Sequence, residues 1–431
     1  MKKVLIFIFS ITLIISSCGN ADQGQLVGVK GRELWFQPDP FGMIYIPMGS
    51  YNMGPSDVDL PYAQTAQSKT VSVQAFYMDD TEITNNEYRQ FVYWVRDSIA
   101  RRLLGDEDEE TYLITTDQYG EDIDPPLINW DAKLRWDKPE VREATAEMFL
   151  PENERFYHRR EIDTRKLDFE YYWIDLREAA KRSSREQGKT DRSVFIKKDI
   201  VNVYPDTLAW IHDFTYSFNE PMTNMYFWHP AYDEYPVVGV NWKQARAFCI
   251  WRTQLFNNYL ASIGSTFVQD FRLPTESEWE YAARGGLDLS PYPWGGPYIR
   301  NSRGCFLGNF KPLRGGYIDD GGIHTVKVTS YSPNDYGLYC MAGNVAEWTN
   351  NAYDESAYNF AHDLNMDYQY EAKDTDPETL KRKVVRGGSW KDIGYYLQTG
   401  TRSFEYQDTA KCYVGFRCVM TYLGRAKGDE F

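Results

Sequence analysis

The chain has 431 residues, which at about 150 residues per domain predicts roughly three domains, or one large domain with insertions. Hydrophobic residues make up 42% and aromatic residues 16%, so a sizeable core can form and disorder over the whole length is excluded. The net charge of −15 gives an acidic surface, which repels phosphate backbones and argues against broad nucleic-acid binding.

The N-terminus has the pattern of a secretory signal. Lys2 and Lys3 precede an apolar run, Val4 to Ile15, that is too short to cross a bilayer, so residues 1–17 are predicted to be a signal peptide. The segment ends in Ile-Ser-Ser-Cys, which resembles a bacterial lipobox with Cys18 as the lipidated residue. A chance cysteine after an ordinary signal peptide is the alternative. The next residues lack the dense acidic run typical of surface-exported lipoproteins, so we expect a lipid anchor in the outer membrane, facing the periplasm.

Cysteine use leaves the disulfide pattern open. Five cysteines follow Cys18, an odd number, so at least one is unpaired or pairs between chains; they are Cys249, Cys305, Cys340, Cys412 and Cys418. Cys412 and Cys418 are close enough in sequence to form a bridge, but spacing does not fix their geometry. Neither the cysteines nor the histidines have zinc-binding spacing.

The first globular segment alternates strands with a helix. The patterns of Met43–Gly49 and Val71–Met78 predict two strands. Thr84 and Glu87 form a capping box, and apolar residues then recur at helical spacing up to Gly105, a predicted stop.

The composition changes near residue 106. Between Asp131 and Ile200, 33 of 70 residues are charged, which is too many for a large core of their own. Two interpretations stay open: solvated helices packed on a neighbour, or a partner-binding arm. The aromatic run Phe169–Ile174 favours the arm, because aromatic residues are enriched in the cores of interfaces.

Globular patterning returns at about Tyr235. Asn241 can cap a helix whose buried face includes Cys249, which is therefore expected to be a small core residue. A second capping box, Thr275 with Glu278, opens another helix. Three glutamates in that helix resemble paired carboxylates for acid–base chemistry, but capping and surface pairing with Arg284 explain them all: Glu276, Glu278 and Glu280.

Motifs in a fixed order carry a resemblance to a known family. The chain contains, in order, Ile46 to Gly49, Phe76 to Asn85, Pro236 to Val240, Arg272 to Gly286, Gly343 to Trp348, Arg386 to Trp390 and Gly415 to Cys418. They resemble the formylglycine-generating enzyme family, also called the sulfatase-modifying-factor fold. The resemblance covers 43–105 and 235–423, which leaves a tether at 18–42, an insertion at 106–234 and a tail at 424–431. It implies one α+β domain related to C-type lectins, with little regular secondary structure and a charged, largely helical insertion.

The resemblance also bears on chemistry. The family's oxidases bind copper through two cysteines shortly after the Gly-Gly-Ser-aromatic segment, and an ungapped register places Asp392 and Leu397 there. Leucine cannot ligate a metal, so no copper, no catalytic residue and no enzyme activity are expected. An oxidase that uses Cys412 and Cys418 as relocated cysteines is the alternative.

The family's calcium sites are possible here. The resemblance implies one site at the Gly343 and Val345 carbonyls and the Glu347 carboxylate, with Cys340 in place of the family's asparagine. It implies a second at Asn309, the Phe310 carbonyl, Asp320 and the Gly322 carbonyl. The alternative is that Asn344 and Glu347 only brace the loop by hydrogen bonds. A calcium-dependent lectin-like binder with loop aromatics at Trp294 and Trp348 is a further possibility, although buried core aromatics are commoner.

A closer resemblance is to the GldK/PorK branch of gliding-motility lipoproteins. It is carried by the lipobox, the Arg96–Arg101 segment and the Tyr226–Tyr232 segment. The GldJ branch shares the fold and is the branch most easily mistaken for it. It implies a non-enzymatic structural component of the type IX secretion system of Bacteroidetes. The implied partners are a GldN/PorN-like periplasmic protein, further copies of this chain in a ring, and the membrane through the lipid anchor.

Overall fold

The computed structural model describes residues 35–55, 67–117, 119–186, 191–215, 220–313, 316, 318 and 321–424. The predicted signal peptide, Cys18, Asp320 and all but the first residue of the tail lie outside these residues. Asp39–Gly424 form one compact unit, to which the insertion belongs. In the described part of the chain, no helix has an apolar stretch long enough to cross a membrane.

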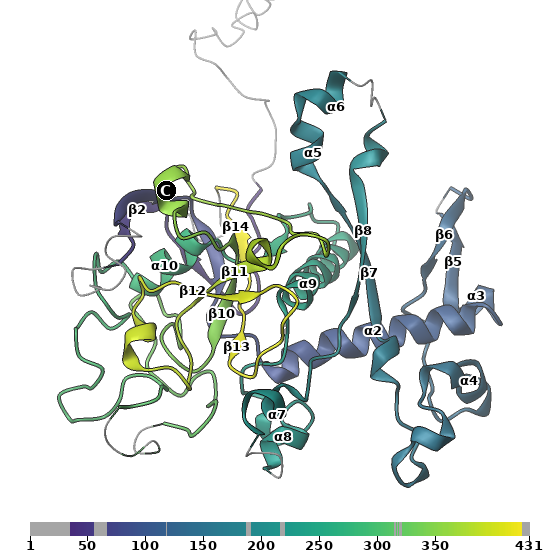
Figure 1. The fold of residues 1–431 in the computed structure, drawn as a ribbon. Helices are drawn as coiled ribbons and strands as arrows, with labels where there is room; N and C mark the ends of the chain where they lie inside the picture. The colour runs from purple at the N-terminus through teal and green to yellow at the C-terminus, as the bar shows by residue number, and fades with distance from the viewer. Residues whose placement is uncertain are drawn as a thin grey trace, which may run out of the picture. The chain divides into compact units, whose positions relative to one another are not determined.

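Two small sheets and several hairpins organise the compact unit (Figure 1). The first sheet has the order β1-β4-β14-β9, with strands Met43–Ile46, Phe76–Asp79, Val419–Thr421 and Phe271–Arg272. The second has the order β12-β11-β10-β13, with strands Ser403–Tyr406, Arg382–Arg386, Ala346–Ala352 and Val414–Gly415. β10 and β13 are parallel, while the other pairs are antiparallel. The mixed α+β architecture predicted from the sequence is therefore confirmed.

Both strands predicted in the first segment are divided in two. Residues 43–49 contribute β1 and the start of β2 (Gly49–Met53), and residues 71–78 contribute β3 (Lys69–Val73) and most of β4. β2 pairs with β3, whereas β1 pairs with β4. Pro47 lies between β1 and β2, and because proline has no N–H it cannot continue a ladder. Sequence alternation finds the extended segments but not the change of partner.

The three long or buried helices begin at side-chain caps that the sequence marks. Capping boxes open α2 (Asn85–Gly105), α9 (Trp242–Ser262) and α10 (Glu276–Arg284). Four shorter helices lie elsewhere in the chain: α3 (Glu109–Tyr112), α7 (Ala209–Asp213), α8 (Pro221–Met225) and α11 (Ala357–Phe360). α10 ends at Gly285, whose φ of +59° suits glycine. The predicted helices are thus confirmed, and α2 ends at Gly105 as expected.

The insertion is less helical than expected. Its longest elements are two β-hairpins, β5 (Leu113–Thr116) with β6 (Asp122–Ile128), and β7 (Asp168–Ile174) with β8 (Ile196–Asn202). The helices between them are single short turns: α4 (Pro139–Ala144), α5 (Leu176–Ala180) and α6 (Arg182–Glu186). Aromatic residues give β7 strong strand propensity, and alternate residues Phe169 and Tyr171 are buried. Interleaved charges hid that alternation in the sequence.

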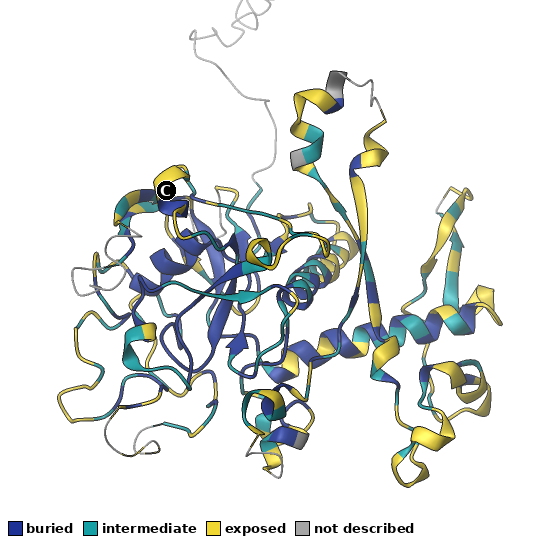
Figure 2. Cartoon of the chain, viewed as in Figure 1, coloured by how far each residue is buried: buried dark blue, intermediate teal, exposed yellow. Residues whose placement is uncertain are grey.

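Burial distinguishes the body from the insertion (Figure 2). α10 is buried along its whole length and packs near β2, β3, β10 and β11. Its Trp279 and Ala282 belong to the main apolar cluster together with Ile46, Met78 and Val419 of the first sheet. The insertion is anchored on α2 through Phe169, whose ring lies 5.3 Å from that of Phe91, while much of its remaining surface is exposed.

Candidate functional site

The segment assigned to the copper-binding cysteines contains a hydrogen-bonded turn and an apolar anchor. Asp392 Oδ2 accepts hydrogen bonds from the backbone N–H of Ser389 at 3.0 Å and from its hydroxyl at 2.6 Å. Leu397 is fully buried in an apolar cluster with Phe306 and Phe310. Neither position offers a thiolate, the ligand that monovalent copper requires.

The cysteines of the C-terminal segment are buried thiols. Burial raises the pKa of Cys412, with a further contribution from Asp213. Burial likewise raises the pKa of Cys418, assisted by Cys249, whose Sγ lies 3.3 Å from that of Cys418. Protonated, buried thiols are poor nucleophiles and poor metal ligands. Cys418 neighbours Cys249, and all five cysteines of the described chain are free in the structure.

The first predicted calcium loop is tied together by a buried ion pair. Both carboxylate oxygens of Glu347 accept hydrogen bonds from Arg417, at 2.7 and 2.6 Å, and one also accepts from Trp279 Nε1 at 2.7 Å. Cys340 donates its thiol proton to a backbone carbonyl at 3.2 Å, and burial raises its pKa. A guanidinium thus stands at the carboxylate that calcium would need, and this loop does not fit a calcium cage.

A second buried carboxylate braces the same loop. Glu82 accepts a hydrogen bond from Asn344 Nδ2 at 2.8 Å and another from the Val345 backbone N–H at 3.2 Å. Burial raises the pKa of Glu82 well above its ordinary value, and the nearby Glu347 carboxylate raises it further. Hydrogen bonding by Asn344 and Glu347 is the bracing role that the sequence left open.

The second predicted calcium loop is only partly described. Asn309 is buried and donates from Nδ2 to the His324 carbonyl at 2.7 Å, which holds the segment after Gly322 against it. The Asn309 carbonyl accepts from the Asn344 N–H at 2.8 Å, and the Phe310 ring is in the apolar cluster around Leu397. With Asp320 outside the described residues, oxygen donors of Asn309, Phe310 and Gly322 remain as a partial hard-cation set.

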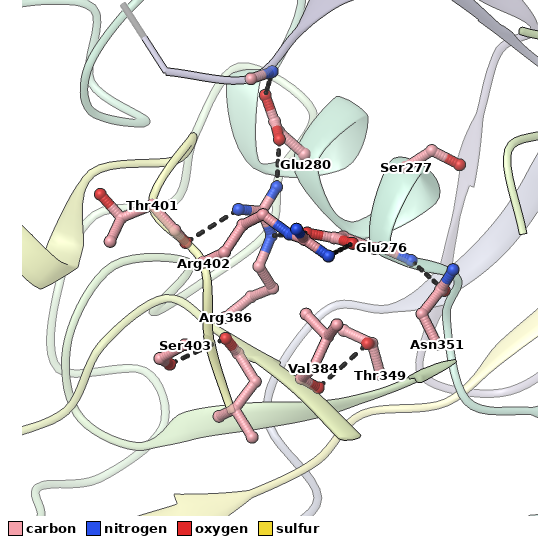
Figure 3. A network of polar contacts seen from close by, with 12 residues as sticks. Glu276, Ser277, Glu280, Thr349, Asn351, Val384, Arg386, Thr401, Arg402 and Ser403 are labelled. Carbon is pink, nitrogen blue, oxygen red and sulfur yellow. Dashed lines mark hydrogen bonds and ion pairs between the residues drawn. The ribbon is translucent and has the colours of Figure 1, made fainter. Parts of the chain in front are cut away.

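The largest concentration of buried charge lies at α10 (Figure 3). Glu280 accepts from Arg284 at 2.7 Å, from Arg386, and from the Gly54 backbone N–H at 2.9 Å. Glu276 accepts from Arg402 at 2.6 and 3.1 Å. We call these five charged residues the acid–arginine network. It joins α10 to β11 and to the segment that leads into β12.

Charge complementarity offsets the cost of burying this network. Burial alone would lower the pKa of Arg386, but the Glu280 carboxylate beside it raises that pKa above the usual arginine value. Burial would raise the pKa of Glu276, and Arg402 and Arg386 hold it below its usual range. Tyr51 stays neutral, because burial and Glu280 both raise its pKa. The carboxylates are engaged as structural partners of arginine and have no free position for proton transfer.

Sequence reasoning underestimated these glutamates. It assigned them to capping and surface pairing, but Glu276 and Glu280 are buried, and the predicted Glu280–Arg284 pair forms in the interior. Glu278 does serve as a cap, and it also pairs with Arg272 at 2.6 Å. One signal in the sequence could have revealed the buried pairs. Arginines recur inside glycine-rich or aromatic motifs, whereas an arginine that only faces solvent does not need such a motif around it.

The aromatic residues proposed for a lectin-like surface differ in exposure. Trp348 is fully buried and donates to the Val240 carbonyl at 3.0 Å, so it is a core residue. Trp294 is partly exposed, stacks on Tyr292 with ring centroids 4.9 Å apart, and donates to the Tyr298 carbonyl. Trp348 is thus the core aromatic residue that the sequence analysis favoured, and it does not share an exposed surface with Trp294.

The sequence was compared with known protein families and proteins. A family model described as "Sulfatase-modifying factor enzyme 1-like domain" matches residues 36–422. "Inactive C-alpha-formylglycine-generating enzyme 2" of Bos taurus is 36% identical over 202 residues, 46% of this chain and 53% of the relative. "Formylglycine-generating enzyme" of Bos taurus is 24% identical over 391 residues, 89% of this chain and 76% of the relative.

The chain was also compared with solved structures. PvdO from Pseudomonas aeruginosa has a TM-score of 0.46 and 15% sequence identity, with 88% of this chain and 94% of that chain covered. The alignments with the inactive enzymes of Bos taurus and Mus musculus span about half the length of those relatives.

Proposed function

The chain belongs to the sulfatase-modifying factor enzyme 1-like family, and we propose that it is a non-enzymatic member with a structural role. The observation that carries the proposal is the segment after Gly388, where Asp392 closes a turn and Leu397 fills an apolar cluster. The buried thiols of Cys412 and Cys418 do not replace the missing ligand chemistry. A family member described as inactive among the relatives is in keeping with such a loss.

We propose further that the protein is a GldK/PorK-type lipoprotein of the type IX secretion system, anchored by Cys18 in the outer membrane. The sequence resemblance is the basis of this assignment. The insertion supports it, because hairpin β7–β8 exposes apolar side chains that a solvated spacer would not need. Tyr172 and Ile200 are each 60% exposed, and Ile174 is 59% exposed. In this proposal, the hairpin contacts a GldN/PorN-like protein or a second copy.

Cell fractionation and a pull-down test this role. Cys18→Ala should move the protein from the membrane to the soluble fraction, since acyl chains supply the anchor. A tagged wild-type protein, crosslinked in mild detergent, should be recovered in a large complex with a second periplasmic protein. Retention of Cys18→Ala in the membrane would assign anchoring to partners, and recovery of a lone monomer would reject the structural role.

A hairpin variant locates the contact. Tyr172→Ser combined with Ile200→Ser should reduce recovery of the complex, while the matched change Leu289→Ser, at an apolar side chain that is 44% exposed outside the insertion, should not. Equal recovery with both variants would remove the hairpin from the interface. Both proteins should have the wild-type circular dichroism spectrum.

The enzyme alternative has its own test. Wild-type protein supplied with copper should not oxidise a cysteine-containing substrate peptide, as followed by the mass of the peptide. Oxidation that is lost in Cys412→Ser and Cys418→Ser would replace our proposal with the relocated-cysteine oxidase.

Calcium remains part of the proposal at the Asn309 loop alone. Calcium should raise the melting temperature of the wild type, and a chelator should lower it, because a bound ion stabilises only the folded state. Asn309→Ala should abolish the response. An unchanged melting temperature on addition and removal of calcium would reject the site.

A further inference from the structure

An arginine-rich groove lies between α2 and the insertion, away from the loops described above. Its volume is about 810 Å³. Tyr93 and Arg96 of α2 form one side, Arg142 and Phe149 another, and Trp228 contributes from the end of the insertion. Its size is within the range of about 300 to 1,000 Å³ that is typical of ligand sites.

Aromatic rings hold the guanidinium groups in place. The Arg96 guanidinium lies 4.7 Å from the Tyr93 ring centroid and 5.2 Å from that of Trp136. The Arg160 guanidinium lies 3.8 Å from the centroid of Phe149 and donates to the Arg142 carbonyl at 2.6 Å. A guanidinium stacked on a ring keeps its N–H edge available for a carboxylate or phosphate.

Most of this positive charge lacks an acidic partner. Arg96 pairs with Asp97, but among the described residues no ion pair involves Arg142, Arg155 or Arg160. Burial lowers the pKa of Arg160, and the nearby charges of Arg142 and Arg155 lower it further. Like charges held close together repel, so this arginine cluster costs free energy. The chain has a net charge of −15 and therefore many acidic residues, yet none forms an ion pair with these arginines among the described residues. An anionic ligand would relieve that repulsion.

Much of the rest of the groove is apolar. Leu167 and Val92 line it as buried side chains, and Ile162 is half-buried. Trp228 is 47% exposed, with its ring 6.0 Å from that of Tyr204. A free phosphate would leave this apolar area in water, so the complementary ligand combines negative charge with an apolar body.

We propose that this groove binds a peptide segment of another protein, in which acidic side chains lie beside an aromatic or aliphatic one. Arg142 and Arg160 receive the carboxylates by paired hydrogen bonds, and the Trp228 side receives the apolar group. Glu161 also lines the groove and disfavours ligands of dense negative charge, such as polyphosphate or nucleic acid. The inference does not depend on the proposed secretion role.

A phage-displayed random peptide library, selected on the wild-type protein, provides the test. Selected peptides should be enriched in aspartate and glutamate next to an aromatic or aliphatic residue, and a synthetic copy should bind saturably in calorimetry. Arg142→Gln and Arg160→Gln should each weaken binding at least about tenfold, as expected for loss of a charge-assisted hydrogen bond. Trp228→Ala should weaken binding through the apolar half.

Matched controls separate the groove from general electrostatics. Arg303→Gln removes one exposed arginine outside the groove and should leave affinity unchanged. Arg142 is exposed, so its replacement preserves the fold even if that of Arg160 does not. A selection without acidic enrichment, equal binding by Arg142→Gln, or equally strong competition by inorganic phosphate would each overturn the proposal.

Discussion

The acid–arginine network predicts an unusual order of stabilities. It contains two carboxylates, Glu276 and Glu280, and three guanidinium groups, those of Arg284, Arg386 and Arg402. Glu280→Gln leaves one carboxylate to balance three buried cations. Arg386→Met instead leaves two carboxylates and two cations, each carboxylate with its own arginine. Glu280→Gln should therefore lower the free energy of unfolding more than Arg386→Met does.

The magnitude follows from burial. Both side chains are fully buried, and breaking a buried pair by removing one partner costs about 3 to 5 kcal/mol. We expect that cost for Glu280→Gln, which is a large part of the 5 to 15 kcal/mol typical of a folded protein. For Arg386→Met, which loses a 2.8 Å bond to the Thr401 carbonyl but keeps the charge balance, we expect about 1 to 3 kcal/mol.

Urea denaturation, followed by circular dichroism and tryptophan fluorescence, measures both costs. Glu355→Gln is the control, since this exposed carboxylate should change the free energy of unfolding by less than about 0.5 kcal/mol. If Arg386→Met were at least as destabilising as Glu280→Gln, counting charges would be the wrong account of this site.

Three further predictions concern single features. Because burial raises the pKa of Glu82 above its unfolded value, the folded state binds that proton more tightly, so stability should fall as pH rises through the folded pKa. Glu82→Gln should remove this slope, and parallel curves of unfolding free energy against pH would contradict the reasoning. Under oxidising conditions, the neighbouring thiols of Cys249 and Cys418 should form a disulfide worth about 2 to 4 kcal/mol, detected by mass spectrometry; a melting temperature insensitive to reductant would exclude it. Gly343→Ala should be far more destabilising in urea than Gly120→Ala, because both glycines have positive φ but only the Cβ at 343 would meet a backbone carbonyl, at 2.4 Å; equal costs would mean that strain alone matters.

Sequence reasoning worked where structure depends on neighbouring residues. The cap of α10 needs Thr275 and Glu278, three residues apart, and the same local rule found the start of α2, while Asn241 as an N-cap marked the start of α9. It failed where partners are distant: Glu280 meets Arg386 across 106 positions, and no local pattern marks that contact. The hairpin β7–β8 was missed for a related reason, since both of its strands pack against α9, which lies far along the chain from β7.

The candidate sites show the same division. By register, the sequence placed Asp392 and Leu397 at the positions where the resemblance puts the copper-binding cysteines. The structure shows their contacts: Asp392 accepts a hydrogen bond from Ser389, and Leu397 packs in an apolar cluster. For Glu347 the sequence supplied the residue but not its partner, because Arg417 lies 70 positions away. A carboxylate near a carbonyl-rich loop can bind a metal ion or pair with an arginine, and only the folded arrangement distinguishes the two.

In the non-enzymatic role that we propose, the fold is kept without the ligand chemistry of the family's oxidases. At the two positions that the resemblance matches to the oxidases' thiols, Asp392 closes a turn by accepting hydrogen bonds from Ser389, and Leu397 packs in the interior. The ion pairs of Arg386 with Glu276 and Glu280, which join β11 to α10, lie outside this turn and need no metal. Since the elements that stabilise the body and the residues that would carry oxidation are separate, family membership alone does not determine activity.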